Sequence, residues 1–489
     1  MKVKKFHFLS ILIFIILLIP VIIPFHSYNQ SIATRNRTSS TEPSEETTPG
    51  QEVVDYFRWL FYHDWNIGEP YEPEVDGTGF PQSRNIYGSS YIPFESEFIT
   101  DYAEITPILS PNNSKSSIVD LIDSAEYTLD IEQMYIYNSL TEIVNAIIAA
   151  NNRGVKVRII LGDDEDSKEF ADNVGSLSNV EIKICTGNAP IYFEQHNKGI
   201  IIDNETVLIS SINWSPTSIN ENREAGLIIK STAVTNYYLS LFDHDWSVCF
   251  DYDPTEHLKA SSLENSYIGT SNLLSSDNYL EPETFNGTMN MTVMASPDNC
   301  YGEVSKLLSN AEESIDISVY TLSSPYLLDI IRERLSQGVE VRLLLEFHPV
   351  SYYEQQYNQY AMNNLTVLGV ESPDDPSTTY KAEGLWNSAE FTFQHCKYCI
   401  IDNKTLILSS GNWARSSCPK PQEDGDVDGN RDWWIAIYGG NPGDIDLNGD
   451  EDFIFEIPSF NVFFIIGSIG ITVLIISTIE LKKKTRSKK

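Results

Sequence analysis

The stretch HNKGIIIDNETVLISSINW at residues 196–214 decides the fold, because its pattern returns as HCKYCIIDNKTLILSSGNW at residues 395–413. In both stretches Lys lies two residues after the first His, Asp seven residues after it and Asn seventeen residues after it. An isolated His-x-Lys is most often an ordinary surface feature. Four residue types that recur with unchanged spacing indicate instead that the chain contains an internal repeat.

The repeat extends to the N-terminal side of both stretches. Ser-Pro, Ala-Glu, Asp-Ile and then Gly-Val-x-Val-Arg occur in this order within residues 105–161 and again within 291–345. Apolar spacing predicts helices at 143–150 and 327–335, and β-branched runs predict strands at 155–161 and 339–345. Alternating strands and helices are typical of α/β units on a mostly parallel or mixed sheet. We therefore expect an α/β protein with two tandem domains.

Composition sets the expected limits of these domains. We expect the first at 101–250 and the second at 291–440, joined at 251–290 by a connector rich in Ser, Asn, Asp and Pro. Residues 31–100 read as a polar spacer followed by an irregular aromatic lead-in that packs on the first domain. Residues 441–457 read as an acidic linker.

Two apolar runs bracket the chain. Residues 1–30 have the basic start and apolar middle of a signal peptide or uncleaved signal anchor. Residues 458–481 are long and apolar enough for a transmembrane helix, and 482–489 form a basic tail. Because Lys and Arg stay on the cytoplasmic side, we expect a protein of the cell membrane with its tail inside and its catalytic domains outside the cytoplasm.

Charge and cysteine content limit the partners and the compartment. The chain has 33 Lys and Arg against 69 Asp and Glu, a net charge of −36, which opposes non-specific binding to a polyanion such as duplex DNA. Its six cysteines, in an expected oxidising location, allow one to three disulfides. Cys396 and Cys399 form a CxxC inside a predicted strand with no second CxxC, which favours packing over a zinc or redox role.

The repeated residues suit phosphoryl chemistry. On a strand, residues two apart project from one face, so each His lies beside its Lys; the catalytic candidates are His196, Lys198 and Asp203 with His395, Lys397 and Asp402. Candidates for binding the substrate phosphate are Asn213, Asn412, Ser211 and Ser410, because amides and hydroxyls donate to phosphoryl oxygens. Two imidazoles on opposite sides of such a clamp allow one to attack phosphorus while the other protonates the leaving oxygen, without a metal.

A doubled HxKxxxxD motif, each copy followed by a Ser-x-Asn turn, resembles the phospholipase D superfamily across roughly residues 105–440. The resemblance implies two α-β-α sandwich domains related by a pseudo-two-fold axis, here flanked by membrane segments. It also implies one active site at the domain interface and a phosphohistidine intermediate. By this resemblance His196 would be the nucleophile and His395 the acid, although the pseudo-symmetry permits the reverse.

The resemblance also suggests roles for four carboxylates. It implies that Asp203 and Asp402 mainly brace the site rather than react. Glu224 and Asp432 look like the acids that orient the catalytic imidazoles, with an ordinary solvated or paired carboxylate as the alternative.

An acidic segment after the second domain resembles the start of a calcium loop. Its candidate ligands are Asp444, Asp446, Asn448 and Asp450. The twelfth position falls on Phe455 instead of the Glu that such loops need, which favours a solvated acidic loop. We therefore expect that no cofactor is required, with structural calcium as the alternative.

The leading hypothesis is a membrane-anchored phosphodiesterase that hydrolyses or transfers phospholipid head groups at a membrane surface. We expect a monomeric catalytic unit, because one chain carries both histidines. The alternatives are a nuclease of the same superfamily, which the acidic charge opposes, a cardiolipin synthase-like transferase, and a non-catalytic surface protein.

Overall fold

A computed structural model describes residues 47–71, 94–185, 192–253, 282–421 and 429–440, together with two strands at 461–466 and 471–476. The first five ranges lie in one compact unit, Glu45–Ile445. The expected signal segment, basic tail and candidate calcium ligands lie outside the described residues.

One mixed sheet runs through the compact unit, and its strand order is β1-β15-β12-β11-β16-β17-β18-β10-β2-β8-β7-β6-β3-β4-β5-β9. The first-half strands are β2 (Glu97–Ser110), β3 (Thr128–Gln133), β4 (Lys156–Gly162), β5 (Val180–Cys185), β6 (Lys198–Ile202), β7 (Thr206–Ser210), β8 (Glu224–Lys230) and β9 (Phe250–Asp251). The second-half strands are β10 (Phe285–Ser296), β11 (Ser314–Val319), β12 (Glu340–Leu345), β15 (Glu383–Trp386), β16 (Lys397–Ile401), β17 (Thr405–Ser409) and β18 (Asp432–Tyr438), joined by β1 (Glu69–Pro70). A small separate pair consists of β13 (Val370–Glu371) and β14 (Thr379–Tyr380).

From either edge toward the centre, equivalent strands of the two repeats follow one another in the same order, as the internal repeat requires. The centre is the antiparallel pair β2 and β10, which is in register from Ile105 opposite Phe285 to Glu97 opposite Val293. In each half the next three strands are antiparallel, and the strands beyond them are mainly parallel. The two repeats therefore share one continuous sheet.

Helices cover both faces of this sheet. The first half contains α2 (Ser114–Asp123), α3 (Thr141–Arg153), α4 (Glu165–Val174), α5 (Pro216–Asn220) and α6 (Thr232–Val248). The second half contains α8 (Cys300–Ser309), α9 (Pro325–Ser336), α10 (Tyr352–Met362) and the π-helical turn η1 (Asn363–Leu368). Helix α1 spans Pro49–Ile67, before the first repeat.

Three apolar cores follow from this arrangement. One joins both halves on the face covered by α1 and α6, and the other two lie on the opposite face, under α2–α4 in the first half and α8–α10 with η1 in the second. The expected α/β fold with helix layers on both faces of the sheet is confirmed.

The predicted lead-in differs from the structure, because residues Pro49–Ile67 form the regular helix α1. Thr48 caps the helix by accepting from the Gln51 N–H, and Pro49 stands in its first turn. Its buried positions, Val53, Val54, Phe57, Leu60, Phe61 and Asp64, recur at helical spacing. The aromatic residues that looked irregular in sequence therefore form one apolar face.

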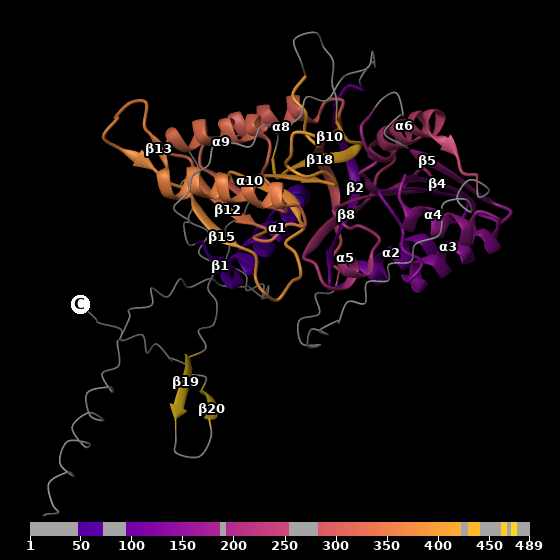
Figure 1. Cartoon of the computed structure of the whole chain (residues 1–489), viewed down its shortest axis with the longest axis horizontal. Coiled ribbons are helices and arrows are strands. Elements are labelled where there is room, and N and C mark those ends of the chain that lie inside the picture. Colours follow the sequence, from indigo (N-terminus) through magenta and orange to yellow (C-terminus); the bar gives the residue numbers. More distant parts are fainter. Residues whose placement is uncertain are drawn as a thin grey trace, which may run out of the picture. The chain divides into compact units, whose positions relative to one another are not determined.

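Helix α1 also packs on the second half instead of the first. It lies against β10, β16, β17 and β18, whereas α6 lies against the corresponding strands β2, β6, β7 and β8. Both helices end in His-Asp-Trp, and the strands that follow them, β1 and β9, pair with β15 and β5 at opposite sheet edges. In Figure 1, α1 and β1 are indigo and lie among the orange elements of the second half. The unit α1–β1 is thus the counterpart of α6–β9, supplied from the N-terminal side of the chain.

The segment predicted as a transmembrane helix also differs from the prediction in its described residues. Strands β19 (Asn461–Ile466) and β20 (Ile471–Ile476) form an antiparallel pair. Both strands are rich in β-branched and aromatic residues, which favour strands, and Gly467 and Gly470 lie between them. Among the described residues, none of the helices combines the length and the apolar character needed to cross a bilayer.

One disulfide, Cys185–Cys249, joins the end of β5 to the end of α6. The other cysteines, Cys300, Cys396, Cys399 and Cys418, are buried thiols. Cys396 packs into the core shared by both halves and Cys399 into the core on the opposite face, so the CxxC residues point to different faces of β16. This orientation fits packing and prevents the two sulfurs from binding one metal ion.

Candidate active site between the two halves

The repeated histidines precede two hairpins, β6–β7 and β16–β17. His196 of the first half contacts the second half, and His395 of the second half contacts the first half. His196 and His395 stand two residues before β6 and β16, where the chain leaves the antiparallel pairing. The His196 N–H donates to the Arg431 carbonyl at 3.2 Å, and the His395 N–H donates to the Arg223 carbonyl at 2.8 Å. Each catalytic candidate is therefore held at its backbone by the opposite half.

The imidazoles are also paired across the two halves. His196 Nδ1 lies 2.8 Å from an oxygen of Asp432, and His395 Nδ1 lies 2.8 Å from an oxygen of Glu224. Because a carboxylate accepts at Nδ1, that nitrogen carries the proton and Nε2 keeps its lone pair for chemistry. This geometry is the one that the predicted orienting role requires, with each acid coming from the other half.

The two lysines lie beside these rings. Lys198 Nζ lies 3.0 and 3.2 Å from the two ring nitrogens of His196 and donates to the His196 carbonyl. Lys397 Nζ lies 3.0 and 3.1 Å from the ring nitrogens of His395 and donates to its carbonyl at 2.9 Å. Both lysines are almost completely buried. Each imidazole therefore has a buried lysine beside it.

Burial governs the ionisation of these groups. It lowers the pKa of His395 to about 4, against the opposing charge of Glu224, and it lowers the pKa of His196 as well. Burial also lowers the pKa of Lys198 to about 7 and of Lys397 to about 8. Both imidazoles are consequently neutral at pH 7, while the two lysines are close to losing their protons.

The orienting acids remain ionised. Burial alone would raise the pKa of Glu224, but the opposing charges and the hydrogen bond from His395 bring it below its usual value. The same balance, with His196 and Lys198 as partners, lowers the pKa of Asp432. Each imidazole therefore has a charged acceptor behind it, which would stabilise the imidazolium formed when the ring takes up a proton.

The two asparagines have unused acceptors. Asn213 follows β7, and its backbone N–H donates to the Ser218 hydroxyl at 3.1 Å. The side-chain carbonyl oxygens of Asn213 and Asn412 are buried without a hydrogen-bond partner among the described residues. Such groups are costly unless a ligand or water donates to them. Only the amide nitrogens could donate to a phosphoryl oxygen, so phosphate binding by Asn213 and Asn412 stays a prediction.

The two serines occupy a different place from the one expected. Ser211 donates to Glu224 at 2.6 Å and accepts from the Ala225 N–H, and Ser410 donates to Asp432 at 2.9 Å and accepts from the Trp433 N–H. Both serines are completely buried. Their hydroxyls thus support the orienting acids, and phosphate binding by Ser211 and Ser410 does not fit this geometry.

Asp203 and Asp402 lie at the far ends of β6 and β16, away from the histidines. Asp203 accepts the N–H groups of residues 126–128 at 2.7–2.9 Å, and Asp402 accepts those of 312–314 at 2.7–3.2 Å. Both stand at positive φ in the hairpin turn, at 52°. This placement fits bracing of the hairpin and separates both residues from the reaction.

Several neighbours of the histidines had no signal in the sequence. Tyr320 sets its ring edge against His395, with ring centres 4.6 Å apart, and its hydroxyl accepts the Val350 N–H. Gln195 donates to Glu132 at 2.5 Å, and Gln394 donates to Ser318 at 2.7 Å. Arg223 and Arg431 lie in the equivalent sequences Asn-Arg-Glu at 222–224 and Asn-Arg-Asp at 430–432. This repetition was their one signal in the sequence, and it did not indicate a role.

Within the described part of the chain, no group of three or more His, Cys, Asp or Glu side chains is placed to hold a metal ion.

The sequence model of the family described as "Cardiolipin synthase, PLD-like domain" matches residues 118–246 and 304–432, which together exceed half of the chain. The chain belongs to the phospholipase D superfamily. Both copies of the superfamily domain coincide with the two halves of the sheet, so two tandem phospholipase D-like domains are confirmed.

Curated relatives within the phospholipase D superfamily cover parts of the chain. "Mitochondrial cardiolipin hydrolase" of Xenopus laevis is 25% identical over 170 residues, which are 33% of this chain and 78% of the relative. "Phospholipase D" of Rickettsia conorii is 31% identical over 129 residues, 26% of this chain and 62% of the relative.

Two solved structures show similarity at lower identity. A phospholipase D family member of Salmonella typhimurium has 24% identity and a TM-score of 0.26, and covers 32% of this chain and 99% of its own. Phosphatidylserine synthase of Haemophilus influenzae has 12% identity and a TM-score of 0.42, and covers 71% of this chain and 83% of its own.

Proposed function

We propose that this member of the phospholipase D superfamily is a phosphodiesterase that hydrolyses or transfers phospholipid head groups through a phosphohistidine. The observation that carries the proposal is the crossed pairing of His196 with Asp432 and of His395 with Glu224. Because each histidine is completed by the opposite half, the two halves build one site with two activated imidazoles.

The reaction proceeds in two displacements. Nε2 of one histidine attacks phosphorus, and the bond from phosphorus to the leaving alcohol oxygen breaks as the other histidine gives that oxygen the proton on its Nε2. Both rings are neutral in the free site at pH 7, so the acid histidine must take up this proton when substrate binds, which the negative phosphodiester beside it favours. The second histidine then takes a proton from water or another alcohol, whose oxygen displaces the phosphohistidine. Following the superfamily, we assign His196 as the nucleophile and His395 as the acid.

Lys198, Lys397, Asn213 and Asn412 hold the non-bridging phosphoryl oxygens in this scheme. The lysine charges oppose the negative charge that develops in the transition state, and they do so in a buried site where electrostatic interactions are strong. The amide nitrogens of the two asparagines supply donors of fixed direction. No metal or organic cofactor is needed for these steps.

Phospholipid is the proposed substrate class for two reasons. Relatives are named cardiolipin hydrolase and phospholipase D, and the chain's net charge of −36 opposes binding to nucleic acid. We also propose that the catalytic unit acts outside the cytoplasm at a membrane surface. The Cys185–Cys249 disulfide is consistent with an oxidising compartment, and the apolar runs at both ends remain the proposed anchors.

The test is a comparison of two substrates with the full chain. Release of head group from mixed phospholipid vesicles and release of nucleotide from single-stranded DNA are measured beside a His196→Ala blank. We expect head-group release that the blank lacks. Cleavage of DNA that the blank lacks would replace the lipid proposal with a nuclease, and equal signals from both proteins would contradict a phosphodiesterase at this site.

A further inference from the structure

Two buried arginines connect the catalytic histidines to distant helices. Arg223 precedes Glu224, and its carbonyl accepts the His395 N–H while the Glu224 carboxylate accepts at the ring. Arg431 precedes Asp432, and the same two contacts reach His196. Each Arg-acid dipeptide therefore holds one histidine of the opposite half at two points.

The arginine side chains are anchored away from the substrate. The Arg223 guanidinium lies 3.0 Å from Asp64, donates to the Asn112 side chain at 2.8 Å and stacks on the Phe391 ring at 4.1 Å. Both Arg223 and Asp64 are almost completely buried. The Arg223 anchor therefore lies outside the set of residues that would contact a phosphodiester.

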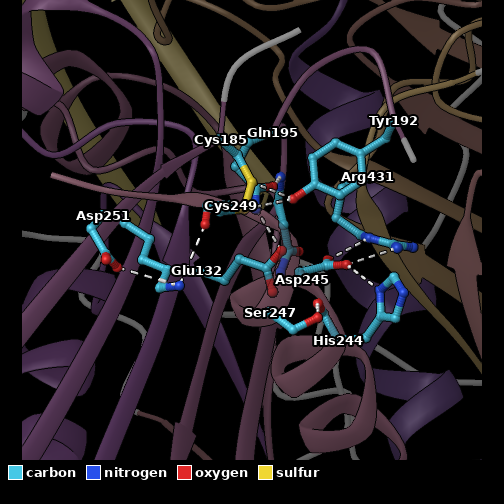
Figure 2. The surroundings of a disulfide bond; sticks show 12 residues. Glu132, Cys185, Tyr192, Gln195, His244, Asp245, Ser247, Cys249, Asp251 and Arg431 are labelled. Carbon is cyan, nitrogen blue, oxygen red and sulfur yellow. Dashed lines mark hydrogen bonds and ion pairs between the residues drawn. A yellow bond between two sulfur atoms is a disulfide. The ribbon is translucent and has the colours of Figure 1, made fainter. Parts of the chain in front are cut away.

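The second anchor repeats the first. Arg431 donates to both oxygens of Asp245, at 2.6 and 3.0 Å, and also donates to Asp298. Figure 2 shows this guanidinium facing Asp245, with Tyr192 and the Cys185–Cys249 disulfide close by. Asp298 and Asn112 occupy equivalent places, two residues after Ser296 and Ser110, so the two anchors match position by position.

The anchoring aspartates come from the two equivalent helices. Asp64 is the Asp of His-Asp-Trp in α1, and Asp245 is the Asp of His-Asp-Trp in α6. Helix α1 packs on the second half, which carries His395. From α1, Asp64 contacts Arg223 of the first half, and the Arg223 carbonyl accepts the His395 N–H. Helix α6 makes the equivalent link from the first half, through Arg431, to His196.

We propose that Asp64 and Asp245 are positioning residues, which act through Arg223 and Arg431 to set His395 and His196, and that α1 is thereby part of the active-site machinery. The inference rests on the proposed function in assuming that these histidines react. Without Asp64 the buried Arg223 charge loses its carboxylate, and the dipeptide that holds His395 shifts with it. A misplacement of about 1 Å at a reacting group costs about 10²-fold in rate.

The Asp64 side gives the cleaner test. Loss of Asp245 leaves Asp298 on Arg431, and fully buried Glu132 lies next to Asp245, where burial and the Asp245 charge raise its pKa well above the usual value. At Arg223 the residue equivalent to Asp298 is the uncharged Asn112. Substitution of Asp64 therefore removes the carboxylate partner with no second acid in the equivalent place.

The chain contains a matched control. Asp316 is as buried as Asp64 and makes two contacts to Arg342, at 2.6 and 3.2 Å, on β11 and β12. We expect Asp64→Asn to lower kcat by about 10²-fold with little change in KM. Asp316→Asn removes an equally buried carboxylate from an arginine that is 16% exposed, and it should change stability only.

The chemical shifts of the histidine ring nitrogens give a readout that does not depend on activity. In full-length protein with ¹⁵N-labelled histidine, the ring nitrogen shifts of His395 should change in Asp64→Asn while those of His196 stay, and Asp316→Asn should change neither. If Asp64→Asn does not fold, Arg223→Lys, which keeps the charge but loses the branched donor, is measured in its place. Unchanged His395 shifts in either variant would overturn the proposal.

The two proposals fail in different ways. An inactive wild type whose His395 shifts still respond to Asp64→Asn would contradict the phosphodiesterase and support the positioning role. An active wild type with kcat unchanged in Asp64→Asn would contradict the positioning role alone.

Discussion

The spacing of His, Lys and Asn predicted the candidate reacting groups, but the partners of those groups depend on three-dimensional pairing. Glu224 and Asp432 follow their own asparagines in sequence, yet each contacts the histidine of the other half. That crossing depends on the central pairing of β2 with β10, which no local pattern encodes. The serine hydroxyls donate to the carboxylate of their own half, Ser211 to Glu224 and Ser410 to Asp432. The sequence could not distinguish this contact from a phosphate contact, because a hydroxyl can donate to either acceptor.

The lysines should control the alkaline limb of activity. Since burial lowers the pKa of Lys198 to about 7 and of Lys397 to about 8, both charges are lost as pH rises through that range. We expect kcat/KM to fall as the pH rises through about 7 to 8, with the decrease in kcat at higher pH because bound phosphate retains the lysine protons. The measurement is kcat/KM against pH.

Two variants sharpen this measurement. Arginine stays charged at high pH, so in the double variant Lys198→Arg, Lys397→Arg the value of kcat/KM should no longer fall at alkaline pH. This holds even where the maximal kcat/KM of the variant is below that of the wild type. Lys306→Met, at an exposed position, should keep the wild-type profile. A limb that persists in the arginine variant would show that other groups cause it.

Gly411 leaves room for the acid behind His196. A Cβ at this position would lie 2.7 Å from the second oxygen of Asp432. We therefore expect Gly411→Ala to displace this carboxylate and to lower kcat by about 10²-fold. Gly302→Ala is the control, because a Cβ there meets nothing within 4 Å; equal kcat in the two variants would contradict this role for Gly411.

At the scale of elements, the sequence predicted helices and strands in each repeat. It did not predict that the N-terminal helix α1 and strand β1 pack on the second half. Strands at 155–161 and 339–345 are confirmed within a residue or two as β4 and β12. Helix α1 escaped because its aromatic residues obscured a regular apolar stripe, and because its partner strands lie more than 200 residues away, from Phe285 onward. The repeated His-Asp-Trp was the one signal of its equivalence to α6.

Asp203 and Asp402, in the turns of the two hairpins, should stabilise the fold through their hydrogen bonds to backbone N–H groups. Asn tolerates the positive φ of these positions but offers one acceptor oxygen in place of two. We expect Asp203→Asn and Asp402→Asn each to lower the free energy of unfolding by about 1 to 3 kcal/mol, with kcat retained. Urea denaturation and steady-state kinetics check this; a folded variant with strongly reduced kcat would instead make the carboxylate part of the reaction.

At the scale of the whole molecule, the buried imidazoles make stability depend on pH. The pKa of His395 is about 4 in the folded protein and about 6.5 in an unfolded chain. Between these values the unfolded state binds more protons, so stability should fall as pH drops from about 6.5 toward 4. The measurement is the free energy of unfolding against pH, with His395→Gln expected to show a smaller loss.

The central claim is that both halves of one chain build a single site that breaks phosphodiesters. The most direct test measures head-group release by wild type, by His196→Ala, by His395→Ala and by an equimolar mixture of the two variants. The account predicts release by wild type, loss in each variant and no recovery in the mixture. Release by either variant at the wild-type rate, or recovery in the mixture, would contradict it.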